Sequence, residues 1–313
     1  MNFITYEDMI NCLYKNIGKI PRDIDLVVGI PRSGLMVANI IALFLNLPLV
    51  DLDGFLQGRV IATGKTRRDS NWVSTVYDVK KILVVDDSIS TGEAIKCAKE
   101  KIANSYFKGD AVYCAIYALP TNFFSVDIYF AIINHPRLFE WNYLHHWILK
   151  HACVDIDGVL CEDPTCFQND DGESYQKFLL NAVPRFLPTK KIGFIVTTRL
   201  EKYRSQTEAW LKRYGIDYNS LVMLNVNSAS DRRRNIDQGE FKGEIYKKSD
   251  CVLFLESNYE QAIKICDVSN KAVFCVDNRK LVTPAGLQSH IITISNDWRI
   301  TLKRALKKII YKN

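Results

Sequence analysis

Acidic residues follow apolar, strand-like segments at three places where they could carry phosphate chemistry. The segments PLVDLDGFL (48–56) and ACVDIDGVL (152–160) share an Asp-x-Asp pair, and VVDDSISTGEAI (84–95) places two acids before a Ser/Thr/Gly turn. An aspartate can attack phosphorus while a second carboxylic acid two residues later protonates the leaving group. Two acids beside a turn rich in backbone N–H groups suit a different ligand, one that has both hydroxyls and a phosphate.

These segments require an α/β fold to position them. Apolar runs alternate with helical patterns from residue 26 to 119, and the alternation restarts at 151–157 and continues to 277. Short buried strands separated by helices predict a parallel sheet covered on both faces. A chain of 313 residues is longer than one that usually folds around a single hydrophobic core. We therefore expect two doubly wound, Rossmann-like domains, at residues 1–149 and 150–313. Ligands of such sheets bind at the carboxyl ends of the strands.

Composition narrows the class of protein. The net charge of +6 is mild, and the nine cysteines show neither a CxxC pair nor zinc spacing, so we interpret them as reduced, mostly structural thiols. No apolar run approaches the roughly 18 residues that a membrane span needs, and MNFITYEDMI lacks the pattern of a secretory signal. We therefore expect a cytoplasmic protein. One short arginine cluster, 232–234, is no reason to expect a nucleic-acid partner.

A second loop of the first half fits a diphosphate. In VVGIPRSGLMVA (27–38), glycines allow a close backbone approach and Arg32 supplies a fork of donors. Neither this loop nor TGKT at 63–66 has the spacing of a P-loop. Strand, loop and helix therefore follow one another twice in this half, each time with a candidate anion site between strand and helix.

The sequence at 84–92 resembles the signature with which type I phosphoribosyltransferases bind phosphoribosyl pyrophosphate (PRPP), and the resemblance covers about residues 20–120. It implies that Asp86 and Asp87 hold the ribose hydroxyls. The basic segment at 57–71 stands where that family has a mobile loop. The resemblance further implies phosphate or pyrophosphate contacts from Arg32, Ser33, Lys65, Arg67, Arg68, Ser88, Ser90, Thr91 and Gly92.

The later Asp-x-Asp copy is followed by a threonine, a lysine and a glutamate at successive strand or helix ends. In this order of motifs, residues 151 to about 290 resemble the haloacid dehalogenase (HAD) superfamily of phosphatases. The resemblance implies that Asp155 is the nucleophile and Asp157 the acid/base. It also implies that Thr197 and Lys242 bind phosphate and that Asp155, Asp157 and Glu256 bind Mg²⁺. Alternatives stay open at two points: Lys247 or Lys248 for the lysine, and Ser257, Asn258 or water beside the metal.

The earlier copy, with Asp51 and Asp53, has no such followers, so we interpret it as structural. The segments around the later copy, 158–190 and 198–241, are too short for a full cap domain and predict an open phosphatase site. The aromatic stretch 135–147 is either an acceptor-recognition element or an interdomain core, and the basic amphipathic stretch 297–312 either touches an anionic membrane or is solvated.

The order of the two halves resembles bifunctional phosphoribosyltransferase/HAD proteins of bacterial polysaccharide loci. The resemblance implies a ribofuranosyltransferase that moves 5-phosphoribosyl from PRPP to a lipid-linked glycan and then removes the 5-phosphate, with Mg²⁺ in both sites. Contact with the inner face of a membrane and a homodimer are further options. The alternatives are an orotate- or purine-type phosphoribosyltransferase fused to a nucleotidase, and a regulator that only binds PRPP.

Overall fold

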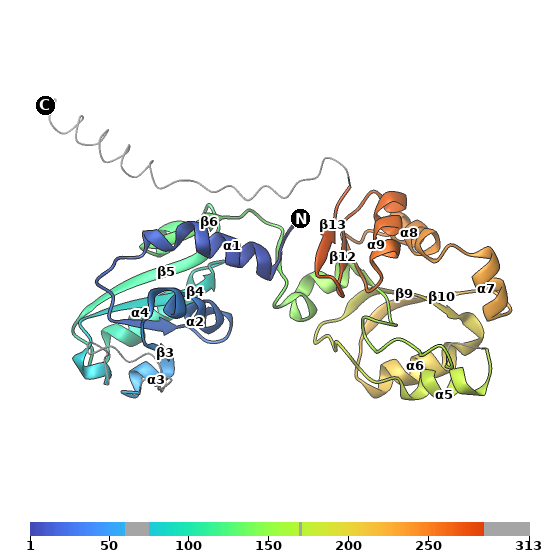
Figure 1. Ribbon diagram of the computed structural model, residues 1–313, viewed down its shortest axis with the longest axis horizontal. Coiled ribbons are helices and arrows are strands. Elements are labelled where there is room, and N and C mark those ends of the chain that lie inside the picture. Colours follow the sequence, from blue (N-terminus) through green and yellow to red (C-terminus); the bar gives the residue numbers. More distant parts are fainter. Residues whose placement is uncertain (60–74, 169–170, 285–313) are drawn as a thin grey trace, which may run out of the picture. The chain divides into compact units, whose positions relative to one another are not determined.

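The computed structural model describes residues 1–59, 75–168 and 171–284, which form two compact units (Figure 1). The N-terminal unit contains Tyr6–Arg137, and the C-terminal unit contains Phe3–Thr5 together with the described residues from Leu138 onward. The contacts thus place the boundary near residue 137, whereas the sequence prediction places it at 149. Packing gives the reason for the early boundary, because Leu138, Tyr143 and Leu149 belong to the core cluster of the C-terminal unit. Phe3 joins the same cluster, with its ring centroid 4.4 Å from that of Phe274.

The N-terminal unit is built on a five-stranded sheet in the order β3-β2-β4-β5-β6, and every neighbouring pair is parallel. The strands are β2 (Leu26–Gly29), β3 (Leu49–Asp51), β4 (Lys81–Ser88), β5 (Asp110–Ala118) and β6 (Ile128–Ile132). The α-helices are α1 (Tyr6–Asn16), α2 (Ser33–Leu45), α3 (Leu52–Leu56) and α4 (Glu93–Ala103), and short 3-10 helices span Ile17–Lys19, Val76–Asp78 and Phe123–Ser125.

Strand β4 shows why this sequence forms a central strand. Ile82 and Val84 belong to the core cluster on the α4 side of the sheet, while Leu83, between them, is fully buried and points to the other face. Burial on both faces explains the continuous apolar run that the sequence shows before Asp86. Gly92 ends the loop after β4 with φ of 86°, a left-handed conformation that favours glycine, and the chain then enters α4.

The C-terminal unit is built on a six-stranded sheet in the order β10-β9-β8-β11-β12-β13, in which only β13 is antiparallel to its neighbour. The strands are β8 (Ala152–Val154), β9 (Ile192–Leu200), β10 (Tyr218–Leu224), β11 (Leu253–Glu256), β12 (Val273–Cys275) and β13 (Lys280–Val282). The α-helices are α5 (Glu173–Asn181), α6 (Arg204–Arg213), α7 (Ala229–Asn235), α8 (Gln238–Lys248) and α9 (Tyr259–Ser269). Three 3-10 helices span Tyr143–His145, Trp147–His151 and Glu201–Tyr203, and β1 (Asn2–Ile4) pairs with β7 (Arg137–Phe139) in a small separate sheet.

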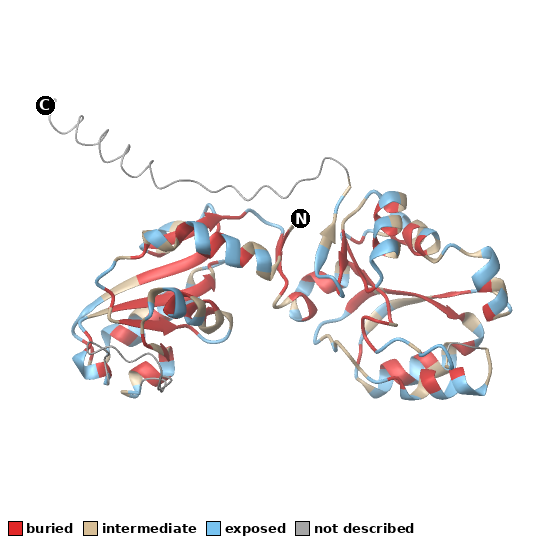
Figure 2. Cartoon of the chain, in the orientation of Figure 1, coloured by how far each residue is buried: buried red, intermediate tan, exposed pale blue. Residues whose placement is uncertain are grey.

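The predicted α/β class with parallel sheets is confirmed for both units. Figure 2 shows burial concentrated in the strands of each sheet, while the helices alternate between buried and exposed residues. Within the described ranges, no helix is long and apolar enough to cross a membrane. The stretch 297–312 and the candidate contacts Lys65, Arg67 and Arg68 lie outside the described residues.

Strand order singles out one place in each sheet. In the N-terminal unit the direction of the connections reverses between β2 and β4, and in the C-terminal unit it reverses between β8 and β11. Open parallel sheets bind ligands at such a switch point, beyond the carboxyl ends of the strands, because the helices on either side diverge there. The loop with Arg32 follows β2 and Asp86 lies near the end of β4, while Asp155 follows β8 and Glu256 ends β11.

Candidate active sites

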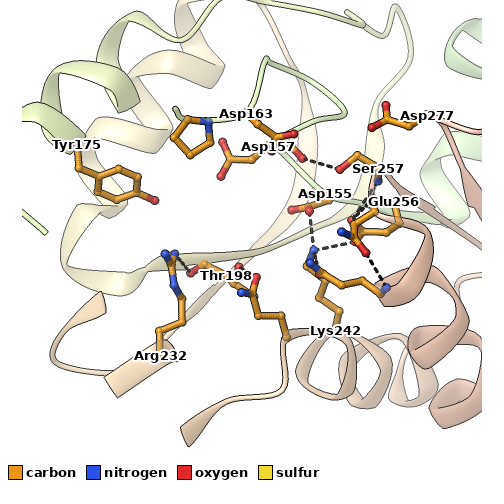
Figure 3. Close-up of a pocket in the computed structure, with 14 residues that line it drawn as sticks. Asp155, Asp157, Asp163, Tyr175, Thr198, Arg232, Lys242, Glu256, Ser257 and Asp277 are labelled. Carbon is orange, nitrogen blue, oxygen red and sulfur yellow. Dashed lines mark hydrogen bonds and ion pairs between the residues drawn. The ribbon is translucent and has the colours of Figure 1, made fainter. Parts of the chain in front are cut away.

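The C-terminal unit holds a pocket of about 330 Å³ at its switch point (Figure 3). Its lining is strongly polar, and among the described residues it includes five carboxylates, called here the five pocket acids: Asp155, Asp157, Asp163, Glu256 and Asp277. Two cations, Lys242 and Arg232, line it as well. The excess of acid over base suits the pocket to a cation, while Lys242 and Arg232 are its groups of the right charge for a phosphate.

Asp155, Lys242 and Glu256 meet at the base of this pocket. Lys242 Nζ lies 2.6 Å from Asp155 Oδ2 and 2.7 Å from Glu256 Oε2, and it also donates to Gln261 Oε1 at 2.9 Å. A backbone group fixes the orientation of the Asp155 carboxylate, because the Ile156 N–H donates to Asp155 Oδ1 at 2.8 Å. The three residues that the sequence placed at a strand end, a helix start and another strand end therefore converge.

Burial sets the electrostatics of this cluster. The side chain of Lys242 is 2% exposed and that of Glu256 1%. Burial raises the pKa of the Asp155 carboxyl to about 7, and Glu256 adds to the rise while Lys242 opposes it. Burial by itself would lower the pKa of Lys242, but Asp155 and Glu256 outweigh it and raise that pKa. Lys242 thus stays charged and holds a buried carboxylate next to the space of the pocket.

The alternative lysines lie elsewhere on helix α8. Lys247 and Lys248 are 57% and 77% exposed at the side chain, and both pair with Glu244 at 3.7 Å. Lys242 lines the pocket and they do not. A helix turns once every 3.6 residues, so a lysine five or six positions later faces a different direction from Lys242.

Asp157 is held by an arginine that the sequence analysis did not assign. Arg199 is fully buried, and its Nε lies 3.1 Å from Asp157 Oδ2 while its Nη2 lies 2.5 Å from Asp157 Oδ1. This fork fixes the orientation of the carboxylate. The only sequence signal was that Arg199 closes the same strand-end segment, VTTR, that supplied the threonine.

The structure places the second threonine of that segment, and not the first, in the pocket. Thr198 lines the pocket and its hydroxyl donates to Gln238 Oε1 at 2.8 Å. Thr197 was the predicted phosphate ligand, but it is 1% exposed and its hydroxyl oxygen accepts the Arg199 N–H at 3.3 Å. Consecutive side chains of a strand point to opposite faces, so one of the two can face the pocket and the spacing alone did not show which.

The predicted metal ligands Asp155, Asp157 and Glu256 all line the pocket, but across the described ranges no three His, Cys, Asp or Glu side chains form a ready metal-binding group. The Lys242 ammonium lies between Asp155 and Glu256. The donor set nevertheless fits Mg²⁺, which prefers carboxylate oxygens. Burial together with the other pocket acids raises the pKa of Asp163, so their mutual repulsion is not fully compensated by protein cations.

Residues next to Glu256 have local structural contacts. Asn258 Oδ1 accepts the Gln261 N–H at 3.0 Å and so caps helix α9, and Ser257 Oγ donates to the Asp157 carbonyl at 3.4 Å. Asp277 lies 2.7 Å from Arg185 Nη2. The sequence analysis did not assign Asp163 or Asp277, although Asp277 ends the apolar segment AVFCVD and could have been found by the same strand-end rule.

In the N-terminal unit the two predicted loops lie side by side. Strands β2 and β4 are neighbours, and the Ile30 N–H donates to the Val85 carbonyl at 2.9 Å. A Cβ on Gly34 would lie 2.9 Å from Asp86 Oδ1, so helix α2 begins in direct contact with that carboxylate and only glycine fits there. The loop of Arg32 and Ser33 therefore adjoins the acids of the second loop.

Asp86 and Asp87 are both buried, at 8% and 5% exposure, although the sequence analysis assigned them to hydroxyl binding at a strand end. The Asp87 N–H donates to Asp86 Oδ1 at 2.9 Å. Burial, and next the charge of Asp87, raise the pKa of Asp86 to about 8. Two adjacent buried carboxyls of this kind are stabilised by a ligand that donates hydrogen bonds to them, as a diol does.

The loop from Ser88 to Gly92 is anchored through its backbone and presents its polar side chains outward. The Ile89 N–H donates to the Tyr117 carbonyl at 2.8 Å, and Arg137 Nη2 donates to the Ile89 carbonyl at 2.5 Å. Ser90 and Thr91 are exposed, as is Arg32. Arg137 belongs to the stretch interpreted as an acceptor element or an interdomain core; the structure instead buries it under this loop, within the N-terminal unit.

The earlier Asp-x-Asp copy makes local contacts. Asp51 Oδ1 accepts the Gly54 N–H at 2.8 Å and so caps the short helix α3. Asp53 lies 3.6 Å from Lys101, with both side chains about half exposed or more. These contacts are those of a structural turn, in agreement with the interpretation from sequence.

Comparison with known proteins bears on the N-terminal unit. Residues 5–120 match the family model described as a phosphoribosyl transferase domain. A search of curated proteins found no match.

Solved structures that match include the Helicobacter pylori xanthine-guanine-hypoxanthine phosphoribosyltransferase, at 15% identity and a TM-score of 0.34 over 45% of this chain and 91% of that one. They also include orotate phosphoribosyltransferase from Aeropyrum pernix, at 20% identity and a TM-score of 0.28 over 41% and 71%. A Pnkp1/Rnl/Hen1 complex matches at 15% identity and a TM-score of 0.29 over 80% of this chain and 95% of that one.

Proposed function

We propose that this protein is a bifunctional ribofuranosyltransferase. The N-terminal unit would transfer 5-phosphoribosyl from PRPP to a glycan acceptor and release pyrophosphate, and the C-terminal unit would then hydrolyse the 5-phosphate. The observation that carries the proposal is the combination, in one chain, of a phosphoribosyltransferase domain at residues 5–120 with a second switch-point pocket where Lys242 joins Asp155 and Glu256.

In the first step the acceptor hydroxyl would attack C1 of the ribose, the bond between C1 and the pyrophosphate would break, and the proton of the hydroxyl would pass to the departing pyrophosphate. Asp86 and Asp87 would accept hydrogen bonds from the ribose hydroxyls, and the loop from Ser88 to Gly92 would hold the 5-phosphate. Arg32, exposed beside them, would offset the negative charge that develops on the leaving pyrophosphate. Mg²⁺, when bound to the diphosphate, would neutralise further charge.

In the second step Asp155 would attack phosphorus, and the bond between phosphorus and the ribose oxygen would break. Asp157, oriented by Arg199, would give a proton to that oxygen and later take one from the water that releases phosphate. Lys242 would offset charge on the phosphoryl oxygens, with the Thr198 hydroxyl as a further donor. The pocket acids would hold Mg²⁺, whose charge would bring a phosphate into an acidic pocket.

The lack of a cap supports a large substrate. Between Asp157 and β9 the described chain forms helix α5 and loops, and between β9 and Lys242 it forms α6, β10 and α7. None of these insertions is a separate domain among the described residues, so a phosphate carried on a glycan can reach the pocket. A lipid-linked glycan, the acceptor that the sequence resemblance implies, fits this arrangement.

The test supplies PRPP and Mg²⁺ with either an oligosaccharide acceptor or a set of purine and pyrimidine bases, and measures pyrophosphate and then phosphate. We expect pyrophosphate release with the oligosaccharide, followed by phosphate release. Transfer to a base and to no glycan would replace the proposal with a nucleobase phosphoribosyltransferase. PRPP binding without any turnover would indicate a PRPP-binding regulator.

A further inference from the structure

One wall of the C-terminal pocket is not used by the proposed hydrolysis. It is formed by Tyr175, Arg232 and Gln238, away from the cluster of Lys242, Asp155 and Glu256. Figure 3 shows Thr198 between Arg232 and Lys242, and the Arg232 side chain extends toward Tyr175. Tyr175 comes from α5 and Arg232 from α7, so each of the two short insertions supplies one residue to this wall.

Arg232 differs from the two arginines that follow it. It is 7% exposed and lines the pocket, while Arg233 and Arg234 are exposed. Its Nη1 donates to the Thr198 carbonyl at 3.2 Å, which fixes the guanidinium against the strand end. Burying a guanidinium costs desolvation free energy, and a fixed guanidinium has the geometry to bind a carboxylate or a phosphate through two parallel hydrogen bonds.

Tyr175 adds a hydroxyl to the same wall. Its ring is 2% exposed, and burial followed by the charge of Asp157 raises the pKa of its phenol, while Arg199 and Arg232 oppose the rise. The Tyr175 hydroxyl thus lies beside Arg232 and within electrostatic reach of Asp157, so it adds a polar group to the same wall. The charge of Asp157 itself is already matched by Arg199.

The position of Asp157 indicates which part of a substrate meets this wall. In an in-line displacement the leaving oxygen departs from the side of phosphorus opposite to the nucleophile, and the acid that protonates it must lie on that side. With Asp155 as nucleophile and Asp157 as acid, the leaving group extends past Asp157, toward Tyr175 and Arg232.

We propose that this wall is a second anion subsite, and that the substrate of the C-terminal unit is a phosphomonoester whose leaving group bears a carboxylate or a second phosphate, bound by Arg232 and Tyr175. This inference rests on the proposed phosphatase function and narrows it. It implies that the glycan next to the ribose 5-phosphate is acidic.

The experiment compares two commercially available phosphomonoesters that differ in the charge of the leaving group, glucose 6-phosphate and 6-phosphogluconate, with Mg²⁺ and full-length protein. We expect the wild type to hydrolyse 6-phosphogluconate with the higher kcat/KM. Arg232→Gln should lower kcat/KM for 6-phosphogluconate by about 10- to 100-fold, equivalent to about 1.4 to 2.8 kcal/mol, and should change that for glucose 6-phosphate by less than about threefold.

Arg233→Gln, an exposed neighbour on the same helix, is the matched control and should behave as wild type with both substrates. Arg232→Lys should recover part of the preference because it keeps the charge without the fork. Retained hydrolysis of glucose 6-phosphate reports that Arg232→Gln is folded. Equal losses on both substrates, or a wild type without preference for the acidic one, would overturn the inference alone. A wild type that hydrolyses neither ester, nor the product of the first unit, would remove the proposed phosphatase as well.

Discussion

Replacing Lys242 with methionine tests the cluster at the base of the C-terminal pocket. The substitution keeps the volume of the side chain but leaves Asp155 and Glu256, 2.6 and 2.7 Å from the lost ammonium, without their shared cation. Removing one partner of a buried ion pair costs about 3 to 5 kcal/mol. Protonation of one of the acids relieves part of this repulsion, so we expect a loss near the lower end, about 3 kcal/mol, at neutral pH.

Differential scanning calorimetry provides the measurement. For a unit of this size, a change of 1 kcal/mol shifts the melting temperature by about 2 to 4 °C, so the transition of the C-terminal unit should fall by about 6 to 12 °C. Phosphate release should be lost in the same variant at temperatures where it is folded, because no cation then offsets the charge of the phosphoryl oxygens. The transition of the N-terminal unit and pyrophosphate release should be unchanged.

Lys247→Met is the control, since it removes a lysine of the same helix that is 57% exposed and lies 3.7 Å from Glu244. Exposed pairs contribute about 0 to 1 kcal/mol, so its melting temperature should stay within about 4 °C of wild type. Two results would contradict this account of the cluster. One is a melting temperature of Lys242→Met equal to that of Lys247→Met, and the other is hydrolysis of phosphomonoesters by Lys242→Met at the wild-type rate.

Three further outcomes are expected. Asp155→Asn should lower phosphate release by about 10³-fold or more while pyrophosphate release continues, so that mass spectrometry detects the 5-phosphorylated product; loss of both activities would contradict two independent sites. Thr198→Val should raise KM for phosphomonoesters about 5- to 10-fold and Thr197→Val less than about twofold; the reverse order would restore the assignment made from sequence. The pKa of Asp86 is raised to about 8, so its protonated form stabilises the fold below its ordinary pKa near 3.8 and this stabilisation is lost as the pH rises toward 8. Asp86→Asn should therefore have a higher melting temperature than wild type at pH 8, and the difference should shrink toward pH 5. The variant should also lose pyrophosphate release. A difference that does not change with pH would contradict the claim that a buried charge on Asp86 destabilises the fold.

The parallel sheets could be predicted because both faces of their strands are buried. A strand such as β4 then reads as an unbroken apolar run, and the polar residue that ends the run lies at the edge where ligands bind. The same rule located Asp86, Asp155 and Glu256, each within two residues of the end of its strand. Lys242 could be predicted only from the order of the motifs, because that order calls for a lysine on a helix after the strand that carries the threonine.

The rest of the pocket depends on packing between segments far apart in the chain. Arg232 and Arg233 are adjacent in one run of three arginines, and contacts far along the chain, such as that of the Arg232 guanidinium with the Thr198 carbonyl, distinguish the buried one. Arg199 pairs with Asp157 across 42 residues of sequence. Long-range contacts of this kind leave no periodic signal, and so they could not be read from spacing.

Residue types along the chain are enough to predict the α/β class, the two loops after β2 and β4 and the residues at the strand ends, because these follow from local burial and turn chemistry. The folded arrangement is needed to show which of two adjacent threonines faces the pocket, which arginine of three is buried, and that Phe3 packs in the core of the C-terminal unit. These outcomes depend on the phase of a strand and on the match between distant surfaces, which local residue types do not specify.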